Sequence, residues 1–360
     1  MLEAADMPGR LTAFVGLDGF VDEILHVVDK REDAAHFHRL STIDKFAERL
    51  AAAAGRSTNI ELVPQRIKLG GNGPIMANAL AAFGVRVTYL GNVGYPAIHP
   101  VFSDLCKRAE VYSIAEPGHT DALEFEDGKI MLGKHSSLRE ITWDNILSRF
   151  GREKLQSNFN RADLVAFVNW TMIPQMSEIW EALLKELCPQ FNGPRRRIFF
   201  DLADPEKRCG GDLWDALKLV SAFQSYFDVT IGLNQKEAFE VGAALGLTSN
   251  DQSPKALANL AREICDRLQI HALALHPVSY ALAVRAGKVD MMEGPYIPAP
   301  LITTGAGDHF NAGFCLGELL GFENVLCVLL GVATSGYYVR SAQSPGLRDL
   351  AELLRSWPTK

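Results

Sequence analysis

The 360-residue sequence lacks a long uninterrupted hydrophobic run, which argues against a conventional membrane span. Its most apolar stretch, residues 325–339, is interrupted by Gly331, Thr334, Ser335 and Gly336. We interpret this stretch as a buried core helix. The opening residues MLEAADMPGRL also lack the apolar segment of a secretory signal peptide. We therefore expect a cytoplasmic protein with no membrane partner.

Basic residues are outnumbered, with 36 Lys and Arg against 43 Asp and Glu and a formal net charge of −7. Nucleic-acid-binding proteins cluster basic residues on one face. The one dense basic run, Arg195-Arg196-Arg197, leads into an apolar segment and is typical of a solvated turn before a strand. We therefore expect no nucleic-acid partner.

Paired cysteines are also missing, because the six cysteines are scattered and show no C-x-x-C spacing. This pattern argues against a zinc site and against a disulfide framework, and it is typical of a reducing compartment.

Short apolar runs alternate with helical patterns along most of the chain, which predicts a mostly parallel sheet covered by helices on both faces. The expected strands are 12–16, 85–91, 164–168, 198–201, 229–233 and 272–275. The expected helices are 75–83, 176–187, 235–245 and 255–267. No Gly/Ser-rich or Pro-rich linker divides the sequence, so we expect one α/β domain over residues 1–360.

Two segments, at about 56–69 and 120–134, instead alternate apolar and polar residues. The second has a turn at Asp127-Gly128 between its apolar runs, as a hairpin would. Strands with period two suit a small antiparallel sheet that has one covered face. The segments form either an edge hairpin of the main sheet or a separate lid.

The most informative local motif is Thr303-Thr304-Gly305-Ala306-Gly307-Asp308, which a helical pattern follows at 309–320. Small residues at a helix start leave backbone N–H groups unpaired, and the helix dipole adds partial positive charge, so such a turn can bind a phosphate. A carboxylate in that turn could accept the proton of an attacking hydroxyl. Alternatively, the glycines make a turn and the dipole alone favours Asp308.

The motif Asn234-Gln235-Lys236-Glu237 follows an expected strand. It is compatible with a capping box at a helix start. It is also compatible with a carboxylate that holds Mg²⁺ through water at the carboxyl edge of the sheet.

Two further groups fit a substrate site in an open parallel sheet, where ligands lie beyond the carboxyl ends of strands. Asp18 and Asp22 lie just past the first expected strand and could bind sugar hydroxyls, or make local turns. The turn Gly70-Gly71-Asn72 precedes an expected helix, and its glycines could admit a substrate close to the backbone or only make a tight turn.

In this order along the chain, these motifs resemble the ribokinase-like family of PfkB-type carbohydrate kinases, from about Phe14 to Leu354. "LGGNGPIMANALAAFGVRVTYLGNVG" is similar to the first family signature and "TTGAGDHFNAGF" to the second. The resemblance implies a three-layer α/β/α sandwich with a mostly parallel central sheet and a small β-sheet lid. It also implies transfer of the γ-phosphoryl group of ATP, with Mg²⁺, to a hydroxyl of a sugar-like substrate.

The resemblance also assigns roles to residues. It makes Asp308 the catalytic base, and the amides of Gly305, Ala306 and Gly307 the anion hole. The cofactor side comprises Asn234 and Glu237, which organise Mg²⁺ and phosphate, together with Thr303 and Thr304. The acceptor side comprises Asp22 and the Gly70-Gly71-Asn72 turn, with Asp18 beside them. Relatives can pair through their lids, so a homodimer through the lid is also implied.

Several positions depart from the family pattern. Ile75 stands where relatives commonly have Asn, and Ile302 where the second signature usually opens with Asp. His276-Pro277 replaces part of a Gly-x-x-Gly nucleotide turn, and 201–208 differs from Asp-x-Asn-x-Arg. The acceptor therefore stays open among a hexose or pentose, a sugar acid, a nucleoside and a sugar phosphate. Asn72, where a Lys could pair with phosphate, favours an unphosphorylated sugar or sugar acid. A catalytically weakened regulatory protein is the alternative from another class.

Overall fold

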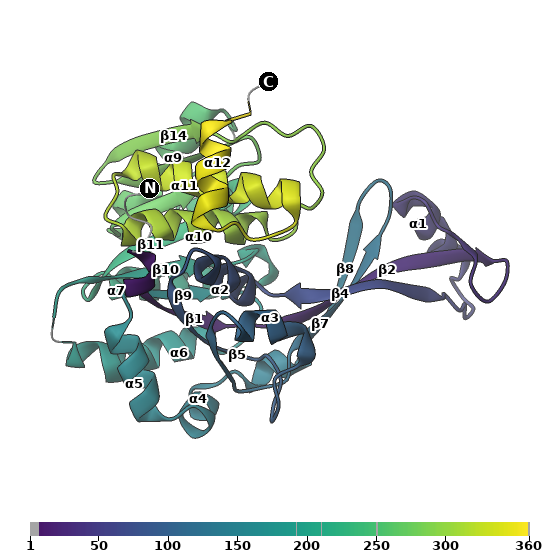
Figure 1. The fold of residues 1–360 in the computed structure, drawn as a ribbon, viewed down its shortest axis with the longest axis horizontal. Helices are drawn as coiled ribbons and strands as arrows, with labels where there is room; N and C mark the ends of the chain where they lie inside the picture. Colours follow the sequence, from purple (N-terminus) through teal and green to yellow (C-terminus); the bar gives the residue numbers. More distant parts are fainter. Residues whose placement is uncertain (1–6, 192, 210, 250, 359–360) are drawn as a thin grey trace.

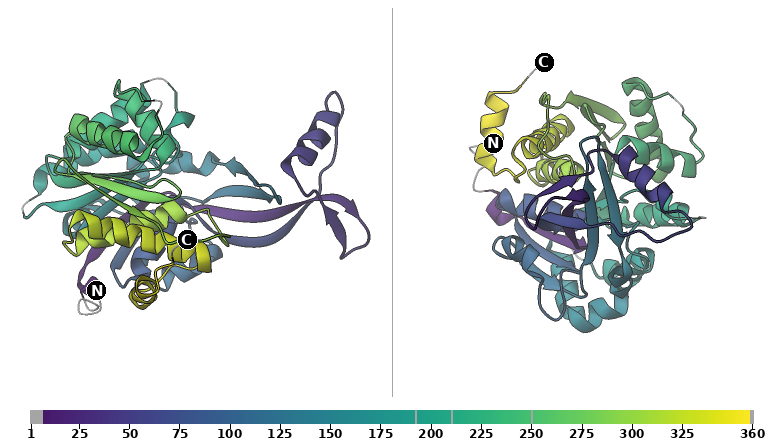
Figure 2. Two further views of the ribbon diagram at one scale, coloured as in Figure 1. Left: turned by 90° about the horizontal axis from the view of Figure 1, so that it is seen from above. Right: turned by 90° about the vertical axis from the view of Figure 1, so that its right-hand side faces the viewer.

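The computed structural model describes residues 7–191, 193–209, 211–249 and 251–358, so the first six residues of the opening segment interpreted above lie outside it. Figure 1 shows a large α/β body from which a narrow arm projects to one side. The views in Figure 2 show that the arm extends well beyond the body and carries helix α1 (Ile43–Ala52) near its tip.

The body is built on a nine-stranded sheet with the order β14-β13-β12-β11-β10-β9-β1-β5-β6. Its strands are β1 (Thr12–Leu17), β5 (Arg86–Gly91), β6 (Glu110–Ser113), β9 (Leu164–Val168), β10 (Arg196–Asp201), β11 (Phe227–Leu233), β12 (Ala272–Leu275), β13 (Tyr280–Arg285) and β14 (Lys288–Glu293). All pairings are parallel except those of β13 with β12 and β14. Every expected strand is present, each starting or ending within two residues of its prediction. The edge strands β6 and β14 were not predicted, nor was β13, which lies between β12 and β14.

Helices cover both faces of this sheet, because alternate residues of each strand point to opposite sides. Phe14 of β1 belongs to one buried cluster and its neighbour Val15 to the other. The first face carries α4 (Trp143–Arg149), α5 (Arg152–Arg161), α6 (Met176–Ala182), α7 (Asp212–Phe223), α8 (Gln235–Ala244) and α9 (Pro254–Leu268). The second carries α2 (Asn72–Ala82), α3 (Ser103–Cys106), α10 (Ala306–Leu319), α11 (Asn324–Ser341) and α12 (Leu347–Arg355).

Two helix predictions have a specific outcome. The stretch 325–339 lies inside α11, whose many buried residues confirm the predicted core helix. In the described part of the chain, no helix combines the length and apolarity that a membrane span needs. The predicted helix 176–187 is α6 continued by a π-helical turn, Leu183–Leu187.

The arm is a separate five-stranded sheet that shares no strand with the main one, so the edge-hairpin alternative is wrong. Its strands are β2 (Phe20–Arg31), β3 (Phe37–Arg39), β4 (Leu62–Gly70), β7 (Gly118–Glu124) and β8 (Lys129–Lys134). The segment 120–134 forms β7, a turn and β8 as expected, whereas in 56–69 the strand begins only at Leu62. The central strand β2, which pairs with both β4 and β7, was not predicted.

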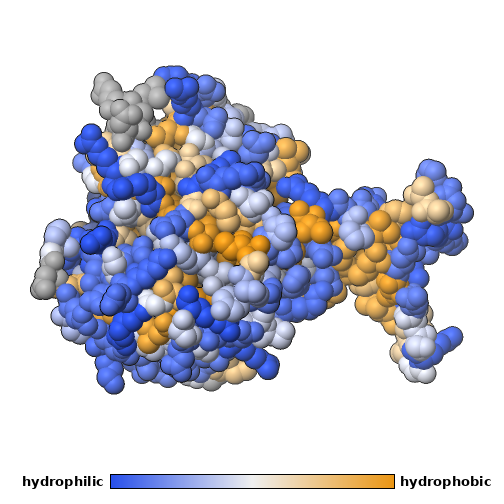
Figure 3. All heavy atoms as spheres, turned by 60° about the horizontal axis from the view of Figure 1, so that its bottom comes forward, coloured by the Kyte–Doolittle hydropathy of each residue, from blue (hydrophilic) through white to orange (hydrophobic). Residues whose placement is uncertain are grey.

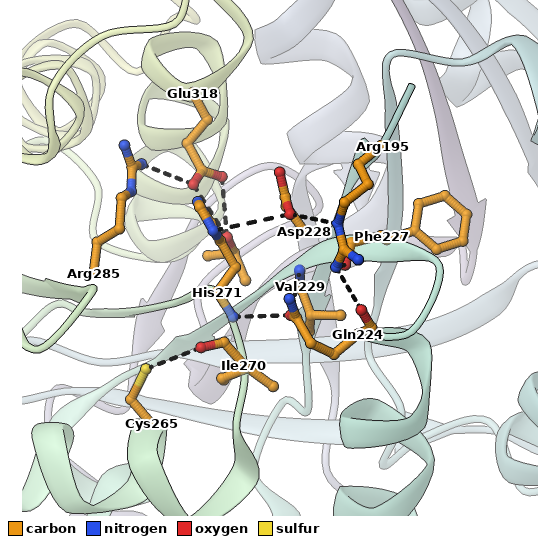
Figure 4. A network of polar contacts seen from close by, with 11 residues as sticks. Arg195, Gln224, Phe227, Asp228, Val229, Cys265, Ile270, His271, Arg285 and Glu318 are labelled. Atoms are coloured by element: carbon orange, nitrogen blue, oxygen red, sulfur yellow. Dashed lines mark hydrogen bonds and ion pairs between the residues drawn. The ribbon is translucent and has the colours of Figure 1, made fainter. Parts of the chain in front are cut away.

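A buried polar network fixes α10 at the amino ends of the parallel strands (Figure 4). Glu318, in the last turn of α10, accepts from Arg285 of β13 at 2.9 Å and from the Thr230 hydroxyl of β11 at 3.1 Å. Burial raises the pKa of the Glu318 carboxyl, while Arg285 acts in the opposite direction. At the surface beside this buried network, Asp228, at the start of β11, accepts from the exposed Arg195 at 3.0 Å. The carboxyl end of α10 is therefore tied to two strands of the sheet.

Candidate active site

The first turn of α10 lies at the opposite, carboxyl edge of the parallel strands. Gly305 caps the helix with a φ of 93°, and a Cβ there would lie 3.1 Å from the Tyr338 hydroxyl and 3.3 Å from Ile75. Glycine is therefore required by both the backbone conformation and the space. The Ala306 amide donates to the Thr303 carbonyl at 3.1 Å. Among the three amides of the expected anion hole, those of Gly305 and Gly307 have no acceptor within the described residues, and the role of all three stays a prediction.

Asp308 lies in this turn with only 7% of its surface exposed. The Asn72 side-chain amide, from the Gly-Gly turn, donates to its Oδ1 at 2.9 Å. Burial raises the pKa of the Asp308 carboxyl to about 8, because desolvation outweighs the Asn72 hydrogen bond and the nearby carboxylates of Asp18 and Glu237 raise it further. A carboxyl with a pKa near neutral pH is suited to accept a proton from a hydroxyl.

Two cavities meet at this turn. One, of about 330 Å³, is lined by Thr304, Gly305 and Asp308 of the turn, and by residues of the arm and of the strand ends. The other, of about 360 Å³, is lined by Thr303, Ala306 and Gly307 on the opposite side of the turn. After the roles that the sequence predicts for their lining residues, we name them the acceptor cavity and the nucleotide cavity. The motif thus divides its residues between two adjoining spaces, with Asp308 facing the first.

Asp22, from the arm strand β2, lines the acceptor cavity and is 5% exposed. Lys68 Nζ of β4 lies 3.9 Å from its carboxylate. Burial raises the pKa of Asp22, and Lys68 and the Thr120 hydroxyl act in the opposite direction. A Cβ on Gly70 would overlap this carboxylate, so the first glycine of the Gly-Gly turn leaves the space that Asp22 occupies. Asp22 is therefore held in position and still faces the cavity.

Asp18 has a different place from the one expected, because it is fully buried and does not line the acceptor cavity. Its carboxylate accepts the Asn72 amide at 2.9 Å, the Gly73 amide at 2.8 Å and the Asn169 side chain at 2.8 Å. Burial raises the pKa of Asp18 to about 6 against these hydrogen bonds. Asp18 thus anchors the turn that carries Asn72, and its oxygens already have protein partners.

The second glycine of this turn, Gly71, has a φ of 95° and caps α2. A Cβ there would lie 3.0 Å from Asp18 Oδ2. Both the left-handed conformation and the close approach therefore favour glycine. Together with the Asp18 anchor, they direct the Asn72 side chain toward Asp308.

The Asn234-x-x-Glu237 motif forms the capping box at the start of α8. Glu237 is buried, and its oxygens accept the backbone amides of Asn234 at 2.8 Å and Asp204 at 2.9 Å. No cluster of three or more His, Cys, Asp or Glu ligands occurs within residues 7–358 as far as they are described. Each Glu237 oxygen nevertheless keeps a second lone pair, so it fits a water-mediated Mg²⁺, which retains much of its hydration.

The nucleotide cavity is lined by the altered turn of His276 and Pro277 that follows β12, and by Asn234. His276 Nε2 is buried and has no hydrogen-bond partner among the described residues. Burial lowers the pKa of His276 to about 4, so its ring is neutral at physiological pH. A Cβ on Gly307 would lie 3.0 Å from the His276 ring, which therefore packs against the first turn of α10.

Several site residues were missed by sequence reasoning. Asn169, just after β9, has a positive φ of 69° and links Asp18 to the acceptor cavity. Asp204 and Lys207 also line that cavity, and Lys207 Nζ lies 2.9 Å from Asp204 Oδ2. For Asp204 and Lys207, the sequence did offer one indication, because both lie in the segment 201–208 that departs from the family pattern.

A family model described as prokaryotic ketohexokinase matches residues 4–357. A ketohexokinase from Haloferax volcanii is 28% identical over 337 residues, which cover 93% of this chain and 88% of that protein. A ribokinase structure from Arabidopsis thaliana, complexed with ribose and ATP, aligns with a TM-score of 0.66 at 14% identity over 96% of this chain and 98% of that one. A probable sugar kinase from Rhizobium etli CFN 42 gives 0.65 at 19% identity with the same coverage. These similarities confirm the predicted ribokinase-like fold.

Proposed function

The chain belongs to the prokaryotic ketohexokinase family, and on this premise we propose that it transfers the γ-phosphoryl group of ATP to a hydroxyl of a ketohexose. Membership confirms the ribokinase-like resemblance and makes the protein an ATP-dependent sugar kinase. The observation that carries the finer proposal is the meeting of the acceptor and nucleotide cavities at the first turn of α10. A phosphoryl group held at this turn would lie between the two substrates.

In the proposed reaction Asp308 takes the proton of the acceptor hydroxyl as its oxygen attacks the γ-phosphorus. The bond from that phosphorus to the bridging oxygen breaks, and ADP leaves. The amides of Gly305 and Gly307 stabilise the charge on the transferred group, and the dipole of α10 adds to this. Asn72 orients the Asp308 carboxylate through its hydrogen bond. Glu237 would hold Mg²⁺ through water, and the ion would supply positive charge that neutralises the nucleotide phosphates.

The charges of the acceptor cavity support an unphosphorylated sugar. Asp22, Asp204 and Asp308 all line it. Its one lysine, Lys207, is paired with Asp204. Carboxylates are good acceptors for sugar hydroxyls, but they repel a second phosphate. This observation disfavours the sugar-phosphate alternative.

We further propose that the arm acts as a lid. Phe20, Thr120 and Met131 of the arm form one wall of the acceptor cavity, so a movement of the arm would open or cover the acceptor. Covering it would exclude water, which would otherwise compete as the phosphoryl acceptor.

The arm also supports the proposed homodimer. Figure 3 shows apolar side chains gathered along it, and Ile67 and Leu132, which the strand register places on the same face of the arm sheet, are 55% and 48% exposed. Exposed apolar patches of this kind mark association surfaces. Analytical ultracentrifugation of the wild type and of Leu132→Glu tests this, since a surface patch that pairs two lids should give a dimer that the new charge dissociates.

The function is tested by ADP release across a panel of ketohexoses, aldohexoses, nucleosides, sugar acids and sugar phosphates. We expect a ketohexose to give the highest kcat/KM, and Asp308→Asn to abolish most of that turnover. If a nucleoside gave the highest kcat/KM, the acceptor would be a nucleoside and not a ketohexose. Binding of nucleotide and sugar without turnover of any acceptor would instead favour the regulatory alternative.

A further inference from the structure

A third cavity, of about 610 Å³, adjoins the acceptor cavity and shares Ile75 with it. Its walls come from β4, α2, the segment around α3, the start of α10 and the end of α11. The reaction proposed above assigns no role to this space.

The cavity is basic in a protein whose net charge is −7. Arg66, Lys68 and Arg108 line it, and its one acidic residue, Asp104, is held by Lys107 outside the cavity at 2.7 Å. The Arg66 side chain has no hydrogen bond or ion pair within the described residues, although its backbone belongs to the β2–β4 ladder. Lys68 Nζ also lies 3.9 Å from Asp22 Oδ2, so this lysine is near both the third cavity and the acceptor cavity. Two arginines and a lysine therefore line a space with little negative charge of its own.

We propose that this cavity binds a small phosphate compound that inhibits the kinase. Arginine guanidinium groups match phosphate oxygens through paired, charge-assisted hydrogen bonds. A cavity of about 610 Å³ also has room for an organic group attached to the phosphate. The binding part of this proposal needs no catalytic activity, whereas the inhibition rests on the proposed role of the α10 turn.

A chain of hydrogen bonds joins the cavity to that turn. Arg108 donates to Asn78 Oδ1 at 3.3 Å, and Asn78 Nδ2 donates to Ser344 Oγ at 3.1 Å. Ser344 Oγ lies 2.9 Å from His309 Nε2, and His309 Nδ1 lies 2.7 Å from the Gly305 carbonyl. Because that carbonyl can only accept, Nδ1 carries the proton and Nε2 accepts from the Ser344 hydroxyl. In this series of four hydrogen bonds, each donor therefore has one acceptor.

This hydrogen-bond series requires a neutral His309 ring. Burial lowers the pKa of His309 to about 4, so the ring is neutral at physiological pH. His309 also stacks on Tyr338, with ring centroids 3.7 Å apart, and the Tyr338 hydroxyl donates to the Thr304 carbonyl at 2.9 Å. The carbonyls of Thr304 and Gly305 are therefore both fixed from the side of the third cavity.

Two contacts would be lost when a phosphate binds in the third cavity, and the loss of each should lower the activity of the kinase. The bond from Arg108 to Asn78 is long and solvent-exposed, so a phosphate would readily take the guanidinium away from Asn78. A phosphate would likewise draw Lys68 away from Asp22. The first change loosens the turn that holds the transferred phosphoryl group, and the second removes the cation beside the acceptor-binding carboxylate. We expect kcat to fall and the acceptor KM to rise.

The test first fills the active site with a non-hydrolysable ATP analogue and a ketohexose. Inorganic phosphate, a ketohexose 1-phosphate and AMP are then titrated by calorimetry, and the three arms identify which phosphate compound binds. We expect one further equivalent to bind for at least one of them. Arg66→Gln and Arg108→Gln should each weaken this binding about tenfold, while Lys30→Gln, which removes an exposed arm charge outside the cavity, should leave it unchanged.

Inhibition is then measured by ADP release with the compound that binds. Ser344→Ala removes the hydroxyl that joins Asn78 to His309 but keeps the three cationic side chains of the cavity. This variant should therefore still bind the phosphate compound, and the compound should lower its kcat less than that of the wild type. Arg66→Gln should keep wild-type turnover when no phosphate compound is added. The proposal is overturned if no compound binds to the filled enzyme, if Lys30→Gln weakens binding as much as Arg66→Gln, or if saturating compound leaves kcat and the acceptor KM unchanged.

Discussion

Replacing Asp308 by Asn separates the proposed base from a structural helix-start residue. The amide keeps the shape of the carboxyl and can still accept the Asn72 hydrogen bond. It cannot take the proton of the acceptor. We therefore expect kcat to fall by ~10²–10⁴, the usual range for removal of a general base, with little change in nucleotide affinity.

The effect on stability has a definite sign, because burial raises the pKa of Asp308 from 3.8 to about 8. The carboxyl then destabilises the fold least below pH 3.8, where both states are protonated, and progressively more as pH rises to about 8. About three pKa units separate 3.8 from pH 7, which corresponds to an upper bound of ~4 kcal/mol at 1.36 kcal/mol per unit. An Asn side chain does not ionise, so the variant avoids the cost of a buried charge. Burial of the polar amide offsets part of the resulting increase in stability. We expect Asp308→Asn to melt at a higher temperature than the wild type at pH 8, with the difference shrinking toward pH 4.

The two measurements belong on the same samples: kcat by coupled ADP release, and melting temperature at pH 5 and pH 8. Asp144→Asn is the control, because Asp144 is an exposed acid in the first turn of α4. It should lose only ~0.3–1 kcal/mol and retain full turnover. If Asp308→Asn behaved like this control, with normal kcat and a slightly lower melting temperature, Asp308 would be a cap and the mechanism would be wrong.

Four further outcomes can be measured directly. In the wild type, kcat/KM should fall about tenfold per pH unit below about 8, since the active base is deprotonated and the pKa of Asp308 is raised to about 8; a flat profile from pH 6 to pH 8 would contradict this. Asp22→Asn should raise the acceptor KM while leaving nucleotide affinity unchanged, because a charged hydrogen bond is worth ~1.5–3 kcal/mol; unchanged acceptor kinetics would move acceptor binding elsewhere. ATP should be favoured over GTP by less than the ~100-fold that ~2.7 kcal/mol gives, because Pro277 removes a backbone donor from the nucleotide turn; competition assays decide this. Acceptor binding should slow hydrogen exchange in β4, β7 and β8, and equal exchange with and without acceptor would count against the lid.

The main sheet was predictable because its central strands are buried on both faces and appear as continuous apolar runs. The edge strand β14 carries polar residues such as Lys288 and Asp290 and shows no such run. Its neighbour β13 does contain a short buried apolar run, Ala281 to Val284, and was missed although the sequence displays that run. Strand β2 was missed for a different reason. Its burial does not alternate, and it contains Asp22, so the same residues that serve the site obscured the strand.

The site was only partly predictable. A carboxylate after small residues at a helix start, as at Asp308, carries a local signal that a sequence displays. The Asp18 carboxylate accepts from Asn169, 151 residues away, and no local pattern in the sequence could predict this contact or the burial that comes with it. The capping and functional interpretations of Glu237 were treated as alternatives. The structure shows the cap, and the cap leaves lone pairs for a hydrated ion, so the two interpretations are compatible.

Helix α10 explains why these distant contacts converge on one reaction. Every residue from Asp308 to Leu319 is buried, so the helix has no solvent-facing side along which it could shift without disturbing the core. Its carboxyl end is tied to β11 and β13 through Glu318, and the carbonyls at its amino end are held by His309 and Tyr338. A transition state is stabilised most by donors that are already in position, since no energy is then spent on ordering them during the reaction. In the proposed mechanism, the polar groups buried along α10 would therefore contribute to catalysis by holding the Gly305 and Gly307 amides and the Asp308 carboxylate in place before either substrate binds.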